Sequence, residues 1–232
     1  MLKENILRIQ NEIVQCALSV GRDATSIKLL AVSKTHSADI VRSALSFGID
    51  FIAESRVQEC EQKLPALVGL YKEFHFVGHL QSNKINKLLS FRPTLIHSID
   101  KYSTAEKLNN ALAHFDFTQD ILIEVNTSGE ASKHGCHPSD IYELLERIDQ
   151  LDKIRVKGLM TIGRLTNDTE QIRDCFKSLR ESFETAKTRN YHHCSMEYLS
   201  MGMSDDFQIA IAEGSNILRV GSAIFGHRDY QK

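Results

Sequence analysis

The chain has 232 residues, of which 42% are hydrophobic, so it can bury a sizeable core and its composition excludes a disordered protein. Its 28 basic and 30 acidic side chains give a formal net charge of -2 without a block of one sign, so nothing in the balance favours nucleic acid as a partner. Five scattered cysteines and the absence of any apolar run near roughly 18 residues predict a cytoplasmic protein without a membrane partner.

Residues 2–20 predict an amphipathic helix ahead of the first strand. Leu2, Ile6, Ile9, Ile13 and Ala17 recur at spacings of four and three, which is the period of one apolar helix face. Gly21 follows as the stop.

From there to the end of the chain, short apolar runs alternate with segments of helical period. The runs predict eight strands at residues 28–33, 49–54, 74–78, 95–99, 120–126, 154–162, 197–200 and 217–221. Between them lie apolar helix faces: Ile40, Ala44 and Phe47; Ile85 and Leu88; Ala105, Leu108 and Leu112; Ile141, Leu144, Leu145 and Ile148; Ile172, Phe176, Leu179 and Phe183.

Eight strands that are each followed by a helix predict an α/β fold, a single (β/α)8 TIM-type barrel preceded by an N-terminal helix, because closure leaves no exposed sheet edge. An open doubly wound sheet is the structural alternative. No G-x-G-x-x-G follows the first strand, so a dinucleotide site has no support. With 3 prolines, 12 glycines and no linker-like stretch, residues 1–232 are expected to form one domain.

In such a barrel the site forms where the strands end, so the residues after each apolar run are the candidates. Lys34 ends the first run and can point into the barrel mouth from a rigid support. A lysine shielded from water there can act as an imine-forming amine. From position alone, an exposed lysine at a strand end is the alternative.

The turn after the seventh strand predicts an anion site. Ser200, Gly202 and Ser204 precede a helix start marked by Asp205 and Asp206, and backbone N–H groups at such a start suit a phosphate. The alternative is that Ser204 or Asp205 only caps that helix.

The turn after the last strand offers a second anion site, at Gly221 and Ser222, and strands 7 and 8 of such barrels frequently hold phosphates. Arg219 lies just upstream in an apolar run, where an unpaired guanidinium is costly. We therefore expect a ligand acceptor or a buried carboxylate beside it.

Two clusters contain ligand-type residues, His134-Gly135-Cys136-His137 and His192-His193-Cys194. Neither has the paired spacing of a structural zinc site, so we interpret both as solvated loop residues and expect no metal. No G-x-S-x-G, P-loop or H-E-x-x-H occurs, so the sequence lacks these motifs of hydrolases and nucleotide-transfer enzymes.

Several long motifs in order carry a resemblance to a known family. They are LAVSKT at 30–35, HFVGHLQSNK at 75–84, VNTSGE at 125–130, GLMTIG at 158–163, SMGMSDD at 200–206 and RVGSAIFG at 219–226. Nearly end to end, the chain resembles the pyridoxal phosphate homeostasis proteins, also called YggS or PROSC proteins.

The resemblance implies a fold like the N-terminal barrel of alanine racemase, with pyridoxal 5'-phosphate (PLP) held as a Schiff base on Lys34. It further implies that Arg219 faces the pyridine nitrogen and that four residues surround the phosphate: Ser200, Ser204, Gly221 and Ser222. An always-charged donor beside that nitrogen disfavours its protonation and makes the ring a weaker electron sink. This combination suits a carrier of a reactive aldehyde better than a transaminase.

The chain departs from the family pattern near the second strand, where Phe-Gly-Glu-Asn is usual and this sequence has Ile52-Ala53-Glu54-Ser55. Ala53 lacks the backbone freedom of glycine and Ser55 has a shorter reach than asparagine, so cofactor contacts from that loop are not carried over. Lys84 and Lys133 lie in family-like motifs, either as secondary attachment or transfer sites or as solvated lysines.

The sequence leaves three candidate functions for the chain. The favoured one is a non-catalytic PLP carrier or regulator in vitamin B6 homeostasis, and we expect it to be a monomer. The alternative is a PLP-dependent amino-acid racemase, but in that family a β-rich domain completes the site, and residues 227–232 leave no room for one after the last motif. A third is a module that docks PLP-dependent enzymes through its surface.

Overall fold

Residues 1–226, which the computed structural model describes, contain eight strands that follow one another in chain order around a closed, parallel barrel. They are β1 (Lys28–Val32), β2 (Phe51–Glu54), β3 (Glu73–Phe76), β4 (Leu95–Ile99), β5 (Gln119–Glu124), β6 (Ile154–Met160), β7 (Cys194–Ser200) and β8 (Ile217–Val220). Because β1 pairs with both β2 and β8, no strand edge stays open. The predicted TIM-type barrel is confirmed, and the open-sheet alternative is wrong.

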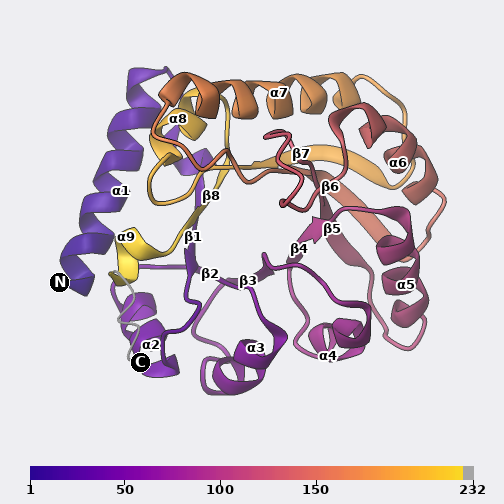
Figure 1. Cartoon of the computed structure of the whole chain (residues 1–232). Helices are drawn as coiled ribbons and strands as arrows, with labels where there is room; N and C mark the ends of the chain where they lie inside the picture. Colours follow the sequence, from indigo (N-terminus) through magenta and orange to yellow (C-terminus); the bar gives the residue numbers. More distant parts are fainter. Residues whose placement is uncertain (227–232) are drawn as a thin grey trace.

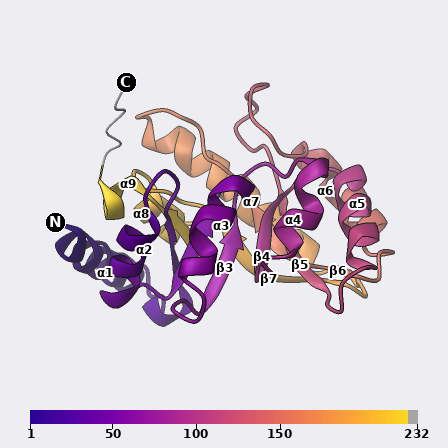
Figure 2. The same cartoon turned by 90° about the horizontal axis from the view of Figure 1, so that it is seen from below.

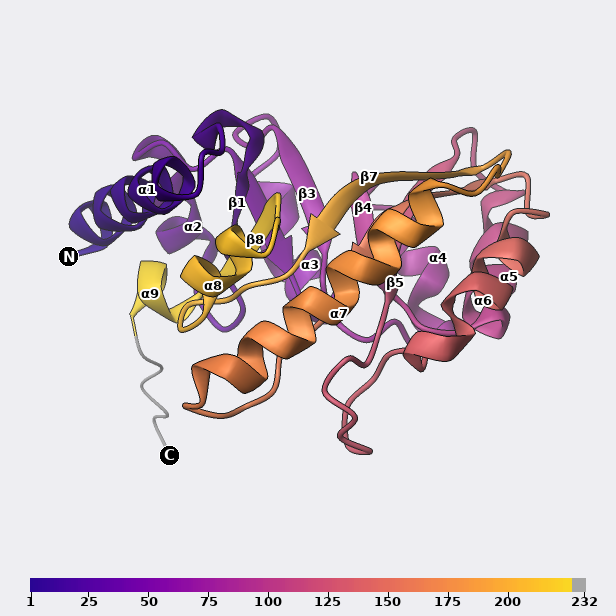
Figure 3. The same cartoon turned by 90° about the horizontal axis from the view of Figure 1, so that it is seen from above.

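Helices cover the outside of the barrel, and one follows each strand (Figure 1). The helices are α1 (Leu2–Ser19), α2 (Ala38–Ser46), α3 (Val57–Lys63), α4 (Ile85–Leu89), α5 (Tyr102–Leu112), α6 (Ile141–Ile148), α7 (Thr169–Lys187), α8 (Phe207–Ala212) and α9 (Ser222–Phe225). Figure 2 shows α2, α3 and α4 in succession along one side, and Figure 3 shows the long α7 running beside β7. None of the described helices is both long and apolar enough to span a membrane.

The N-terminal helix α1 packs beside α8 and α9, next to the place where β1 and β8 meet (Figure 1). Its buried face consists of Ile6, Ile9, Ile13 and Ala17, at the predicted spacings. Gly21 follows the helix with a φ of 68°, a conformation that glycine adopts without strain. The predicted N-terminal helix is therefore confirmed.

Side chains alternate along each strand between two cores. On β1, Ala31 belongs to the large core between strands and helices, whereas Leu30 and Val32 belong to a small core inside the barrel. The small core also contains Ala53, Leu95, Leu122, Met160 and Ile217. Buried polar side chains also lie along the strands, and several of them build the site described below: His75, His97, Glu124, Ser200 and Arg219.

Two local predictions are wrong. The predicted face of α2 is shifted, because Ile40 and Phe47 are exposed while Val41 packs with Ala44 in the core. Phe47 lies at the C-cap, where the helix has ended and its ring lies beneath the Lys3 ammonium. β7 begins at Cys194, three residues before the predicted start, because the backbone of Val156 on β6 already pairs there.

Candidate functional site

Lys34 lies in a tight turn just beyond β1, and it is half-buried. The N–H of His36 donates to the carbonyl of Ser33 across the turn at 3.1 Å. Thr35 has a φ of 71°, which a β-branched residue rarely adopts, and it marks the turn as strained. The chain therefore presents its candidate amine from a fixed and unfavourable backbone conformation.

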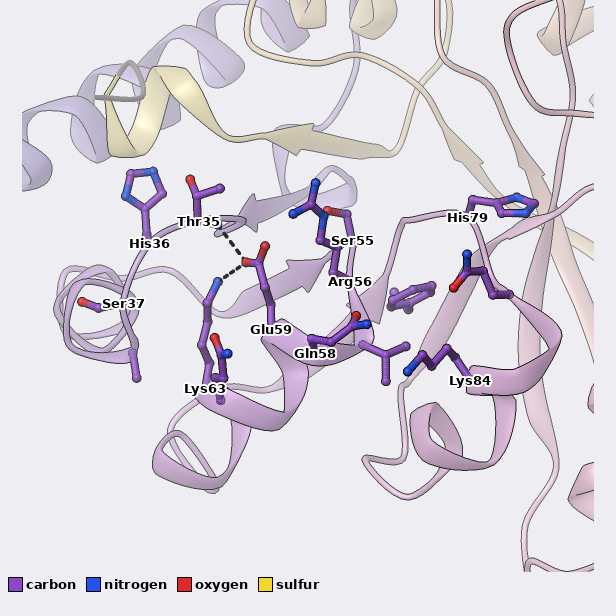
Figure 4. A pocket seen from close by; sticks show the side chains of 15 residues that line it. Thr35, His36, Ser37, Ser55, Arg56, Gln58, Glu59, Lys63, His79 and Lys84 are labelled. Atoms are coloured by element: carbon purple, nitrogen blue, oxygen red, sulfur yellow. Dashed lines mark hydrogen bonds and ion pairs between the residues drawn. The ribbon is translucent and has the colours of Figure 1, made fainter. Parts of the chain in front are cut away.

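Helix α3 holds both residues that flank this lysine (Figure 4). The Lys63 ammonium donates to the Ser33 carbonyl at 2.7 Å, and the Glu59 carboxylate accepts from the Thr35 N–H at 2.8 Å. Lys63 also pairs with Glu59 at 2.6 Å and with Glu54 at 2.9 Å, and Glu54 accepts a short hydrogen bond from the Ser33 hydroxyl. A buried ionic network thus fixes the turn.

Glu54 is the most deeply buried member of this network. Burial raises the pKa of its carboxyl to about 7, although the Ser33 hydroxyl and the Lys63 ammonium oppose that shift. Its Oε2 atom is buried without a hydrogen-bond partner. The neighbouring Ala53 faces the barrel interior and does not have a positive φ, so the backbone freedom of the family's usual glycine is not needed here.

Five of the six predicted cofactor-binding residues line one cavity of about 240 Å³ at the mouth of the barrel: Lys34, Ser204, Arg219, Gly221 and Ser222. They come from the loops after β1 and β7 and from the end of β8. Ser204 Oγ accepts from the N–H of Ala223 at 3.1 Å, so the hydroxyl hydrogen of Ser204 is left to donate to a ligand. A side chain at Gly221 would come within 3.2 Å of the Val32 carbonyl, which explains the glycine.

Ser200 lies apart from these five, fully buried inside the barrel. Its hydroxyl is bonded to Arg219 at 2.7 Å and to His97 at 3.0 Å. The proposal that Ser200 contacts a phosphate stays a prediction, but in this structure its hydroxyl contacts Arg219 at the cavity floor and His97 beneath it.

Arg219 forms that floor. Its guanidinium donates to Ser200 Oγ and, at 2.8 Å, to the carbonyl of Thr161. Burial lowers the pKa of Arg219 to about 10, and the carboxylates of Asp206 and Glu124 oppose the shift. Buried carboxylates therefore lie near the guanidinium as expected, while its direct partners are uncharged.

Beneath Arg219, a chain of hydrogen bonds crosses the barrel interior from one end to the other. His97 Nδ1 lies 3.0 Å from Ser200 Oγ, His97 Nε2 lies 2.8 Å from His75 Nδ1, and His75 Nε2 lies 2.8 Å from Glu73 Oε2. Glu73 also pairs with Lys28 at 2.7 Å, where both side chains are partly exposed at the opposite end of the barrel.

The direction of every bond in this chain follows from Glu73, because an ionised carboxylate can only accept. His75 donates from Nε2 to Glu73 and, with a neutral ring, accepts at Nδ1 from His97 Nε2. A neutral His97 in turn accepts at Nδ1 from the Ser200 hydroxyl, whose oxygen accepts from Arg219. Burial lowers the pKa of both histidines, which agrees with two neutral rings. The bond from His75 holds the pKa of Glu73 down, at about 2.

A larger polar cavity, of about 1010 Å³, adjoins the first over α2 and α3 (Figure 4). His36 and Ser55 line both cavities, so the two are adjacent at these residues. Lys84 lines the larger cavity. Lys133 donates to the carbonyl of Gly163 at 2.8 Å and pairs with Glu130, so it is engaged within its own loop region.

The interpretation of both histidine and cysteine clusters as solvated loops is wrong for their cysteines. Cys136 forms a bridge with Val125 beside β5, and burial raises the pKa of its thiol to about 12. Cys194 starts β7, and burial likewise raises its pKa. His134, His137 and His192 are exposed, as predicted. Sequence reasoning also missed His75, His97 and Glu124; a histidine inside an apolar strand was the available signal for the first two.

Comparison with known proteins identifies the family. The sequence model for "Alanine racemase, N-terminal domain" matches residues 9–229. The chain is 37% identical over 227 residues to the pyridoxal phosphate homeostasis protein of Aquifex aeolicus, covering 98% of each chain, and 35% identical over 236 residues to that of Escherichia coli, covering 100% of this chain and 98% of that one. This chain belongs to the pyridoxal phosphate homeostasis proteins. The resemblance expected from the motifs is confirmed.

Solved structures of similar proteins share the fold. PipY of Synechococcus elongatus with PLP bound is 30% identical and superposes with a TM-score of 0.80, covering 92% of this chain and 100% of that one. A protein from Bifidobacterium adolescentis, described as unknown, is 35% identical and superposes with a TM-score of 0.92, covering 96% of this chain and 94% of that one. The barrel of these two proteins is thus reproduced over nearly the whole chain.

Proposed function

We propose that this chain binds PLP as a Schiff base on Lys34 and acts in PLP homeostasis as a carrier or regulator without appreciable catalysis. The observation that carries the proposal is the single cavity that collects an amine, two hydroxyls, a glycine and a guanidinium from both ends of the sequence. These are the groups that an aldehyde, a phosphate and a pyridine ring require. The PLP bound in the related PipY structure supports the same assignment.

The proposed phosphate contacts are the Ser204 and Ser222 hydroxyls and the backbone at Gly221. Ser204 has a hydrogen to donate because its oxygen already accepts from Ala223. Asp205 also lines the cavity and repels an anion, so the phosphate must lie on the side of the two serines.

The proposed lack of catalysis rests on Arg219. When bound, PLP supplies an electron sink whose strength depends on protonation of its ring nitrogen. Arg219 offers that nitrogen a hydrogen bond from a group that keeps its own proton, which disfavours protonation there. The hydrogen-bond chain beneath Arg219 keeps the guanidinium in place. The site therefore favours holding the cofactor over carbanion chemistry.

A PLP-dependent racemase is the second candidate, because the model for the N-terminal domain of alanine racemase matches the chain. Turnover of amino acids by the purified protein separates the two functions. We further propose that the chain works in the cytoplasm as a monomer and passes the cofactor to PLP-dependent enzymes. Five free cysteines, all without a disulfide, agree with a reducing compartment.

The test is the absorption spectrum of the purified protein with PLP, followed by borohydride reduction and peptide mapping. We expect one reduced pyridoxyl group on Lys34, no adduct in Lys34→Ala, and an unchanged adduct in the matched variants Lys84→Ala and Lys133→Ala. Alanine racemase and transaminase assays are expected to show no turnover.

A colourless protein that leaves Lys34 unmodified would overturn the cofactor assignment. An adduct on Lys84 or Lys133, and not on Lys34, in the parent protein would overturn the choice of lysine. Full biological activity of Lys34→Ala would favour the surface-docking module over the carrier.

A further inference from the structure

Three ligand-type side chains from three loops meet at the mouth of the barrel. His79 follows β3, Asp100 follows β4, and His134 lies in the loop between β5 and α6, which projects beyond the strands (Figure 3). One potential ligand atom from each residue lies within 4.8 Å of the others. Within residues 1–226, no other three histidine, cysteine or acidic side chains gather this closely.

We propose that His79, Asp100 and His134 bind a divalent first-row transition metal ion. The donor set, two imidazole nitrogens and one carboxylate oxygen, suits Zn²⁺, Co²⁺ or Fe²⁺, whereas Mg²⁺ and Ca²⁺ prefer oxygen ligands throughout. Three protein ligands leave at least one coordination position open to water or to a small anion.

The first supporting observation is an unsatisfied carboxylate. Asp100 Oδ1 is buried and has no hydrogen-bond partner. Neither His79 nor His134 forms a hydrogen bond or an ion pair with Asp100 in the described part of the chain, although both lie close by. A buried carboxylate oxygen without a donor is unfavourable, and a bound cation would satisfy it.

The second observation is the contact between the two imidazoles. Their ring centroids lie 4.1 Å apart with 15° between the planes, so the rings stack directly. Two charged imidazolium rings would repel at this distance, and the stacked pair therefore requires at least one neutral ring. A neutral imidazole is the form that binds a metal.

The spacing of the donors is compatible with a bound ion. In tetrahedral coordination, metal–ligand bonds of about 2.0–2.2 Å place two donors about 3.3–3.6 Å apart. Donors separated by up to 4.8 Å would therefore have to approach one another by about 1 Å when an ion binds. His134 lies in an irregular loop, where such a movement is inexpensive. None of the three residues lines the smaller cavity that contains Lys34, and His79 lines the adjacent larger one, so the proposed metal and the proposed cofactor have separate ligands.

The test is titration of the purified protein with Co²⁺ alone, read by its visible absorption, and then displacement by Zn²⁺. We expect one equivalent per chain, both with and without PLP. His134→Ala and Asp100→Asn should each weaken binding at least about tenfold. His137→Ala changes an exposed histidine of the same loop outside the cluster, and Cys136→Ser removes a thiol of that loop; both should bind like the parent.

Equal binding by all variants would overturn the proposal, because it would show adventitious coordination elsewhere on the surface. Loss in Cys136→Ser with retention in His134→Ala would replace the site by a thiolate site. Absence of any Co²⁺ or Zn²⁺ binding would also overturn it. His134 is exposed and Asp100→Asn keeps the side-chain shape, so circular dichroism of the variants should match the parent.

Discussion

Thr35 combines a β-branched side chain with a backbone conformation that such residues avoid, directly beside Lys34. The Glu59 carboxylate fixes this conformation by accepting from the Thr35 N–H. Strain of this kind is of order 1–3 kcal/mol and persists only where neighbouring groups impose it. The strain therefore lowers the stability of the turn, and the groups that impose it give the candidate amine a defined position.

Replacing Thr35 by glycine should raise the stability of the protein. Glycine lowers the free energy of unfolding by roughly 0.5–1 kcal/mol, because it gives the unfolded chain more conformational entropy. The relief of backbone strain at this position is larger than that loss. We expect the free energy of unfolding to rise by about 1 kcal/mol, measured by urea denaturation. Thr188→Gly is the matched control, because Thr188 has an ordinary φ of -81° and should lose stability. A similar loss in Thr35→Gly would show that the turn is not strained.

At the scale of elements, the hydrogen-bond chain joins four strands across the barrel interior. Glu73 and His75 come from β3, His97 from β4, Ser200 from β7 and Arg219 from β8. Each bond polarises the next, so the Glu73 carboxylate partly offsets a guanidinium that lies at the other end of the chain. The interior of this barrel is therefore ordered by polar bonds as well as by apolar packing.

His97→Phe should test this chain. Phenylalanine has a similar shape, but it leaves the Ser200 hydroxyl hydrogen and His75 Nδ1 without partners, and each loss costs about 1–3 kcal/mol. We expect the free energy of unfolding to fall by about 2–5 kcal/mol in urea. His97→Gln, whose amide can accept from Ser200 and donate to His75, should recover part of the loss. Equal stability of His97→Phe and the parent would contradict a role for the chain.

The sequence predicted the strands because apolar runs of the right length alternate with helical periods, and Lys34 because it follows the first run. Strand ends were less predictable. The runs at 154–162 and 120–126 continue past the ends of β6 and β5, since residues there leave the sheet to build the site loops. The polar interior was also missed, because residues 75–77 and 95–99 have the composition of ordinary apolar strands. Only the structure shows that their two histidines, His75 and His97, contact each other inside the barrel.

At the scale of the whole molecule, buried carboxyls make stability depend on pH. Burial raises the pKa of Glu124 to about 7 from an ordinary 4.5, with Arg219 opposing the shift. The folded protein therefore keeps this proton over a range in which the unfolded chain has lost it. The resulting stability is fully present below pH 4.5 and is lost as the pH rises to about 7.

Glu124→Gln should remove that part of the pH dependence. We expect the decrease in the free energy of unfolding between pH 5 and pH 8 to be smaller in the variant than in the parent. The lowered pKa values of His75 and His97 act in the opposite direction, so only the difference between variant and parent isolates Glu124. Glu143→Gln, at an exposed site on α6, should match the parent. Parallel curves for parent and Glu124→Gln would contradict the raised pKa.

The meeting of His79, Asp100 and His134 could not be predicted from the sequence. Their loops follow three different strands, and only closure of the barrel brings the loops together. By contrast, Ser204, Gly221 and Ser222 were predictable as a group, because strands 7 and 8 are adjacent in any barrel of this type. The sequence does not predict how far each loop extends across the mouth of the barrel.

The pairing of β1 with β8 has a consequence for synthesis of the protein. Lys34 leaves the ribosome well before Arg219, and the cavity that both line exists only after β8 has joined β1. A chain synthesised only as far as β7 therefore has the amine but no pocket around it. A ligand of this cavity cannot template the early stages of folding, and its capture marks a barrel in which β8 has been made and has closed on β1.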